Sequence, residues 1–138
     1  MNWLQLSLLS ALFAGLVAIF GKLGMKDIDS VLATTARAIV MMLMLVLLAA
    51  SSGKLAEIQK FPPRTWIFIV LSGLAGAASW LCYFQALKVG DASKVAPVDK
   101  LSTLVTVALA GLILHEPVGW KICVGAALIV MGTICVAL

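Results

Sequence analysis

Five long apolar runs, separated by short polar stretches, follow one another along the chain. A helix that crosses the hydrocarbon core of a bilayer needs about 20 mostly apolar residues. The pattern therefore predicts an all-α fold, a polytopic transmembrane helix bundle in a single domain over residues 1–138. Its five predicted spans are residues 3–23, 31–50, 65–87, 95–114 and 118–138.

Turn and capping residues separate these spans. Asp29 or Ser30 is a suitable N-cap for the second span, and Pro62 and Pro63 interrupt the polar stretch before the third. Pro97 leaves two alternatives for the fourth span. A helix that begins near Pro97 accommodates it in the first turn and places Asp99 at the positive helix end, whereas a helix that begins earlier is kinked there.

Composition indicates that lipid surrounds most of the chain. Of the 138 residues, 63% are hydrophobic and 12% are charged, whereas about a quarter of the residues of a soluble domain are charged. The net charge of +4 comes without any basic cluster longer than two residues, so we expect no nucleic-acid binding.

Residues for catalysis or metal binding are scarce. The chain has one histidine, no Ser-His-Asp set and no phosphate-binding glycine loop. Its three cysteines lie inside apolar runs without a neighbouring histidine, which is typical of packing residues. We therefore expect no enzyme activity, no catalytic residue, no cofactor and no metal site.

Four spans carry a stripe of small or polar residues at steps of three and four, which places each stripe on one helix face. The stripes include Ser7, Ser10 and Gly21; Ser30, Thr34 and Arg37; Ser72, Gly76, Ser79 and Tyr83; and Asp99, Thr103 and Thr106. One interpretation is that these faces converge on a solute pathway. The other is that they mediate close helix packing only.

Arg37 is the most informative residue because a charged side chain inside a span is costly. It either extends to the interface, or faces the bundle interior and binds an anionic group or pairs with Asp99. The aromatic-rich end of the third span either belongs to an aromatic belt at the interface or forms a cavity wall, and it consists of Trp80, Tyr83, Phe84 and Gln85. The candidate pathway residues are Arg37, Ser79, Trp80, Tyr83, Asp99, Thr103 and Thr106.

Basic residues in the loops leave the orientation undecided. One side carries Lys54, Lys60, Arg64 and Lys121, and the other carries Lys22, Lys26, Lys88 and Lys94. The loops alone therefore give the positive-inside rule nothing to act on, whereas counting Arg37 and Lys100 with the spans they enter gives six against four. Such a chain can insert both ways and form an antiparallel homodimer, or the lipids and insertion machinery decide its orientation.

Three segments resemble the EamA domain of the drug/metabolite transporter superfamily. They are YFQALKVGDASKVAP from Tyr83 to Pro97, GLILHEP from Gly111 to Pro117 followed by glycines at 125 and 132, and TTAR from Thr34 to Arg37. Together with the span pattern, the resemblance covers nearly the whole chain.

The resemblance implies a five-helix half-transporter for a small solute, working by alternating access in a prokaryotic-type inner (plasma) membrane. Most members of this family pair two such domains in inverted topology. A lone copy implies a homodimer, for which an antiparallel arrangement is one option, or a heterodimer with a second half-transporter. The alternatives are a non-transporting scaffold or helper subunit, and a lipid-carrier flippase subunit. The first span contains no acidic residue, so proton coupling through a glutamate of that helix is not implied.

Overall fold

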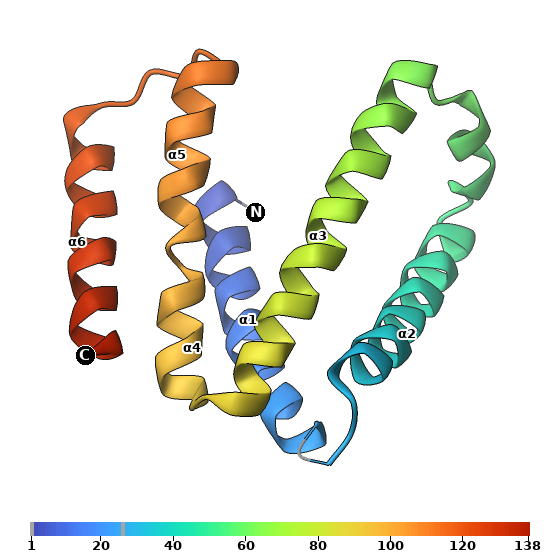
Figure 1. The fold of residues 1–138 in the computed structure, drawn as a ribbon. Coiled ribbons are helices and arrows are strands. Elements are labelled where there is room, and N and C mark those ends of the chain that lie inside the picture. The colour runs from blue at the N-terminus through green and yellow to red at the C-terminus, as the bar shows by residue number, and fades with distance from the viewer. Residues whose placement is uncertain (1, 26) are drawn as a thin grey trace. The chain divides into compact units, whose positions relative to one another are not determined.

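The computed structural model describes residues 2–25 and 27–138, and most of them are helical. Five helical segments of this part are long and apolar enough to cross a membrane, and no strand occurs in it. The predicted all-α fold with five transmembrane helices is therefore confirmed. The helices are α1 (Trp3–Gly24), α2 (Ser30–Ser51), α3 (Pro63–Val89), α4 (Ala92–Asp99), α5 (Ser102–Ile113) and α6 (Trp120–Ala137), with the 3-10 helix η1 (Leu55–Lys60) between α2 and α3 (Figure 1).

The chain divides into two compact units. The central unit, Gly21–Lys88, contains the end of α1 and the hairpin α2–η1–α3. The terminal unit combines Met1–Phe20 with Val89–Leu138, and thus the rest of α1 with α4, α5 and α6.

Backbone and capping contacts define both ends of α2. At its start the Asp29 carboxylate accepts hydrogen bonds from the amides of Val31 (2.9 Å) and Leu32 (3.1 Å), so the first of the two predicted caps is confirmed. At its end Gly53 has a φ of 69°, and its amide donates to the Ala50 carbonyl. With the bond from Lys54 to Ala49, this arrangement is a Schellman motif.

The fourth span consists of two helices. It begins at Ala92, so Pro97 lies inside α4, and the helix is interrupted at Lys100 and Leu101 before α5 begins. Short-range bonds replace the α-helical pattern there, because the Lys100 amide donates to the Pro97 carbonyl. The alternative in which Asp99 lies in the first turn is wrong, since Asp99 is the last residue of α4.

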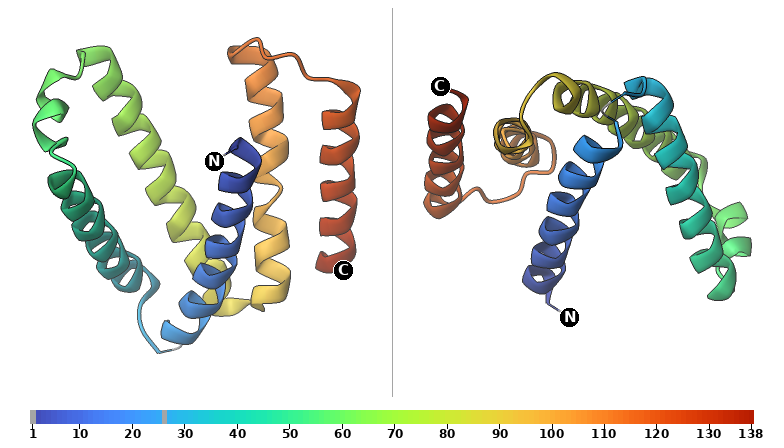
Figure 2. Two further views of the ribbon diagram at one scale, coloured as in Figure 1. Left: turned by 180° about the vertical axis from the view of Figure 1, so that it is seen from behind. Right: turned by 90° about the horizontal axis from the view of Figure 1, so that it is seen from below.

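The terminal unit is joined by a hydrogen bond across helices. The Thr133 hydroxyl of α6 donates to the Pro97 carbonyl of α4 at 3.2 Å, and Thr133 is only 5% exposed. Ala126, on the same helix, is also buried. The two views in Figure 2 show α6 running beside the α4–α5 pair.

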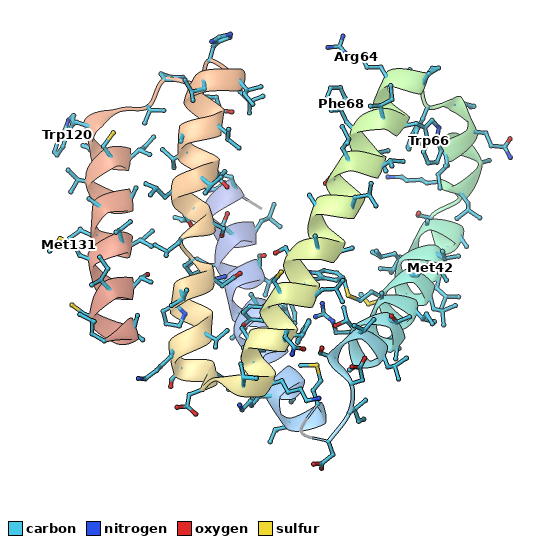
Figure 3. The ribbon with its side chains drawn as sticks, viewed as in Figure 1. Met42, Arg64, Trp66, Phe68, Trp120 and Met131 are labelled. Carbon is cyan, nitrogen blue, oxygen red and sulfur yellow. The ribbon has the colours of Figure 1, made fainter. Side chains whose placement is uncertain are left out.

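Large apolar side chains cover the outer faces of the helices. Leu47 is 69% exposed and Trp120 is 72% exposed in the isolated chain. In Figure 3, Trp120 and Met131 both lie on the side of α6 that faces away from α5. Apolar surface of this extent requires lipid or another protein chain against it.

Candidate functional site

The predicted polar face of α2 lies against α3 in the central unit. Ser30 and Thr34 are buried, and Arg37 follows at the next helical step. The Ser30 hydroxyl donates to the Gln85 side-chain oxygen of α3. The Thr34 hydroxyl donates to the Ser30 carbonyl at 2.6 Å within its own helix. The helical spacing of Ser30, Thr34 and Arg37 therefore places these polar residues on the face of α2 that lies against the C-terminal part of α3.

The Arg37 guanidinium lies close to two aromatic rings of α3. Its Cζ atom is 4.3 Å from the ring centroid of Trp80 and 4.2 Å from that of Phe84. Both distances are within the range of cation–π attraction, which is strongest where water is excluded. Tyr83 meets Phe84 edge to face, with centroids 5.4 Å apart and an interplanar angle of 75°. The guanidinium therefore lies against two aromatic side chains of α3.

Two nitrogens of Arg37 are left without a hydrogen-bond acceptor. Nε and Nη2 are both buried, and neither has a partner among residues 2–25 and 27–138. Buried polar groups in proteins are nearly always bonded, so an unpaired pair calls for an explanation. A charged group that lacks hydrogen-bond acceptors inside an apolar span is a candidate for binding a ligand.

The end of α1 packs tightly against Phe84, one of the two aromatic residues that contact Arg37. Phe84 is 1% exposed and Leu87 is 0% exposed, which makes them the best-buried large side chains of the described residues. The ring of Phe84 lies directly over Gly21, whose missing side chain leaves the space that the ring occupies.

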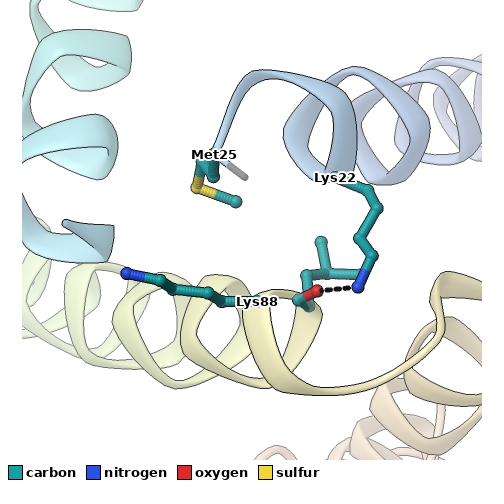
Figure 4. Close-up of a pocket in the computed structure, with 4 residues that line it drawn as sticks. Lys22, Met25 and Lys88 are labelled. Atoms are coloured by element: carbon teal, nitrogen blue, oxygen red, sulfur yellow. Dashed lines mark hydrogen bonds between the residues drawn. The ribbon is translucent and has the colours of Figure 1, made fainter. Parts of the chain in front are cut away.

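Lysines fasten this end of the central unit through backbone carbonyls. Lys22 Nζ donates to the Leu87 carbonyl at 2.7 Å, and Lys88 Nζ donates to the Ile28 carbonyl at 3.0 Å. Both lysines line a small pocket with Met25 and Leu87, and the dashed line in Figure 4 marks the Lys22 bond. Lys22 thus satisfies a carbonyl in the last turn of α3, which lacks an intrahelical donor, and Lys88 satisfies a carbonyl in the loop between α1 and α2.

The other predicted pathway residues lie in different surroundings. Ser79 is exposed on α3, on the face next to the one that contacts Arg37. In the terminal unit, Asp99 forms an ion pair with Lys100 (3.3 Å), and the Thr106 hydroxyl donates to the Ser102 carbonyl of its own helix (3.0 Å). Thr103 is half-buried. Pairing between Arg37 and Asp99 would join the two units, and it stays a prediction.

Phe84 and Gln85 belong to the aromatic-rich end predicted for the third span, but they were not among the candidate pathway residues. The polar stripe predicted on this span runs through Ser79 and Tyr83, whereas the residues that contact α2 are Trp80, Phe84 and Gln85. The contacting face is largely aromatic, so a stripe of small polar residues does not include it. The four-residue spacing of Trp80 and Phe84 places both rings on one side of the helix and was the signal for this face.

Comparison with known proteins agrees with this structure. The model of the EamA-like transporter family matches residues 1–138. A protein of Sinorhizobium sp, named "Uncharacterized transporter in cobO 3'region", is 42% identical over 136 residues, which cover 99% of this chain and 96% of the relative. No solved structure matches the chain. With five helices of membrane-spanning length besides, the chain belongs to the EamA-like transporter family and is a multi-pass integral membrane protein.

Proposed function

We propose that this membrane transporter carries a small organic solute by alternating access, as a dimer of two five-helix chains in a prokaryotic-type inner membrane. The observation that carries the proposal is Arg37, a cation within a span whose guanidinium lies against Trp80 and Phe84. Charged residues in such positions commonly belong to substrate or ion pathways. The proposal includes no chemical conversion of the solute.

The dimer is supported by size and by charge. Transporters of this kind usually pair two inverted repeats around a site near the bilayer midplane, and this chain contains one family domain. Its loops carry four basic residues on each side, at Lys54, Lys60, Arg64 and Lys121 against Lys22, Lys26, Lys88 and Lys94. Equal numbers favour neither orientation, as an antiparallel homodimer requires.

Thiol accessibility tests alternating access. The native cysteines Cys82, Cys123 and Cys135 are first replaced by alanine, and a single cysteine is then placed at Ser79 or Thr106. A lined pathway predicts labelling by a membrane-impermeant maleimide from one side, with a rate that changes when a transported solute is added. Labelling from neither side would support dry packing and the scaffold alternative.

Orientation reporters test the antiparallel dimer. Fusions of alkaline phosphatase and of a fluorescent protein to the C-terminus should both be active in the wild-type chain. Replacing Lys54 and Lys60 with glutamine leaves two basic residues against four, so one reporter should then dominate. A wild-type chain with a single orientation would exclude the antiparallel homodimer.

Transport itself is measured in proteoliposomes. A panel of labelled metabolites and drug-like solutes is tested by counterflow, with and without a proton gradient. At least one solute should accumulate above protein-free vesicles and saturate with concentration. If flux is unchanged in the Arg37→Gln variant, Arg37 lies outside the pathway.

A further inference from the structure

The unpaired nitrogens of Arg37 form one edge of its guanidinium. Nε and Nη2 are adjacent, and their N–H bonds point in the same direction in the guanidinium plane. This edge matches two oxygens of a carboxylate or a phosphoryl group, which accept both bonds in parallel. The missing partner of Arg37 therefore has a defined shape, two anionic oxygens in the plane of the group.

Two aromatic rings already lie beside the guanidinium. Their centroids are 4.3 Å (Trp80) and 4.2 Å (Phe84) from Cζ. A ligand at the unpaired edge would be selected by hydrogen bonding rather than by stacking. A cation or an apolar body would gain nothing from this edge.

The helices around Arg37 supply no anion. Neither α2 nor α3 contains an aspartate or a glutamate. Nearby polar groups on the same face of α2 have other partners, since Ser30 bonds to Gln85 and Thr34 bonds to the Ser30 carbonyl. Asp29, just before α2, caps that helix. Helices α2 and α3 thus hold a charged donor pair and no carboxylate to accept from it.

We propose that Arg37 binds the anionic group of the transported solute, a carboxylate or a phosphoryl group, through Nε and Nη2. This inference rests on the proposed transport function and names its substrate class. Both nitrogens are covered by the chain's own atoms, so the anion reaches them only after neighbouring side chains move. Binding is thereby coupled to a local opening of the α2–α3 contact, which is the kind of coupling that alternating access needs.

Matched pairs of solutes test this substrate class. Each pair consists of a labelled carboxylic acid and its carboxamide, and a second series pairs phosphate monoesters with the free alcohols. The variants are Arg37→Gln, Arg37→Lys and the control Arg64→Gln, whose guanidinium lies 6.0 Å from the Phe68 ring at the start of α3. Counterflow is the first readout.

Binding is measured separately, by the fluorescence of Trp80. Trp3, Trp66 and Trp120 are replaced by phenylalanine, so that the remaining indole reports on its contact with Arg37. The protein is kept in an alkyl maltoside without phosphate, and phosphatidylglycerol is added in a parallel series. Elution volume and helical circular dichroism identify any variant that fails to fold.

The inference predicts a preference for acids or phosphate esters of about tenfold or more over their neutral partners, as expected for a charge-assisted bond pair. Arg37→Gln should abolish the preference, Arg37→Lys should retain part of it, and Arg64→Gln should leave it unchanged. The Lys variant keeps the charge but loses the planar pair of donors.

Contrary outcomes separate the inference from the proposed function. Transport of neutral or cationic solutes without any preference for acids would overturn the inference and leave the transport function standing. Binding of acids without flux would support the inference and count against transport. A fluorescence response to phosphatidylglycerol but to none of the acids would assign the edge to a lipid headgroup and overturn the inference.

Discussion

A methyl group added to Gly21 would lie 2.6 Å from Cε1 of Phe84. Carbon atoms that are not bonded to each other do not approach so closely, so the ring would have to move. Phe84 is 1% exposed and its ring also contacts the Arg37 guanidinium. A change at Gly21 in α1 is therefore transmitted through one aromatic ring to the charged group of α2.

Gly21→Ala should destabilise the protein by about 1–3 kcal/mol, as overpacking usually does, although alanine is the better helix former. It should also alter the fluorescence of Trp80 in the single-tryptophan background, since Trp80 and Phe84 share Arg37. Unfolding in mixed detergent micelles measures the stability. Gly24→Ala is the matched control, because nothing lies within 4 Å of a methyl group there. Equal behaviour of the two variants would contradict the packing described here.

Thr133→Val should loosen the terminal unit. The substitution retains the shape of the side chain and removes the bond to the Pro97 carbonyl. Hydrogen bonds between membrane helices contribute about 0.6 kcal/mol on average and up to about 1.7 kcal/mol, and the burial of Thr133 favours the upper part of that range. Thr106→Val removes only a bond within one helix and should have a smaller effect. The comparison is made by unfolding in micelles, and a larger loss at Thr106 would argue against the cross-helix bond.

Gly53→Ala should cost about 1 kcal/mol, because the left-handed conformation is unfavourable for a residue with a side chain. Gly53 has a φ of 69° and its Cβ would meet nothing within 4 Å, so strain in the backbone is the sole cause expected. Gly73, inside α3 with nothing within 4 Å of an added methyl group, is the control, and alanine there should be neutral or stabilising. Denaturation midpoints of the two variants should differ accordingly, and a neutral Gly53→Ala would contradict the Schellman end of α2.

Ser30 and Gln85 should be energetically coupled. Ser30→Ala, Gln85→Leu and the double variant form a mutant cycle for the bond between α2 and α3. The expected coupling free energy is about 0.5–1 kcal/mol. Ser51 bonds only to its own helix, so Ser51→Ala combined with Gln85→Leu provides an additive reference. Additivity in both cycles would show that Ser30 and Gln85 do not interact.

Much of the fold could be predicted from the sequence because apolar length is a strong signal in a membrane protein. The ends of the spans differ from the helix ends by at most three residues, and Asp29 acts as the cap that its position suggested. The face of α2 was also recognisable, since Ser30, Thr34 and Arg37 are polar residues at helical steps among apolar ones.

The partners of Arg37 were harder to predict for a physical reason. Periodicity identifies which residues share a face of one helix, but it does not say which face of a second helix lies opposite. Trp80 was a candidate pathway residue, whereas Phe84 was recognised only as part of the aromatic-rich end of the third span. The interruption at Lys100 and Leu101 was equally obscure, because Pro97 was compatible with two helix starts.

The bonds of Lys22 and Lys88 have a mechanical consequence for the central unit. A helical hairpin is joined covalently at one end only, and here η1 occupies that end between α2 and α3. At the opposite end Ser30 of α2 bonds to Gln85 of α3, and Lys88 of α3 bonds to the Ile28 carbonyl just before α2. The Lys22 bond ties the end of α1 to the Leu87 carbonyl of α3. These contacts can separate and form again without breaking the chain. The hairpin is thus joined by the chain itself at one end and by hydrogen bonds alone at the other. Arg37 contacts α3 near the hydrogen-bonded end, so separation of the two helices there would change its surroundings.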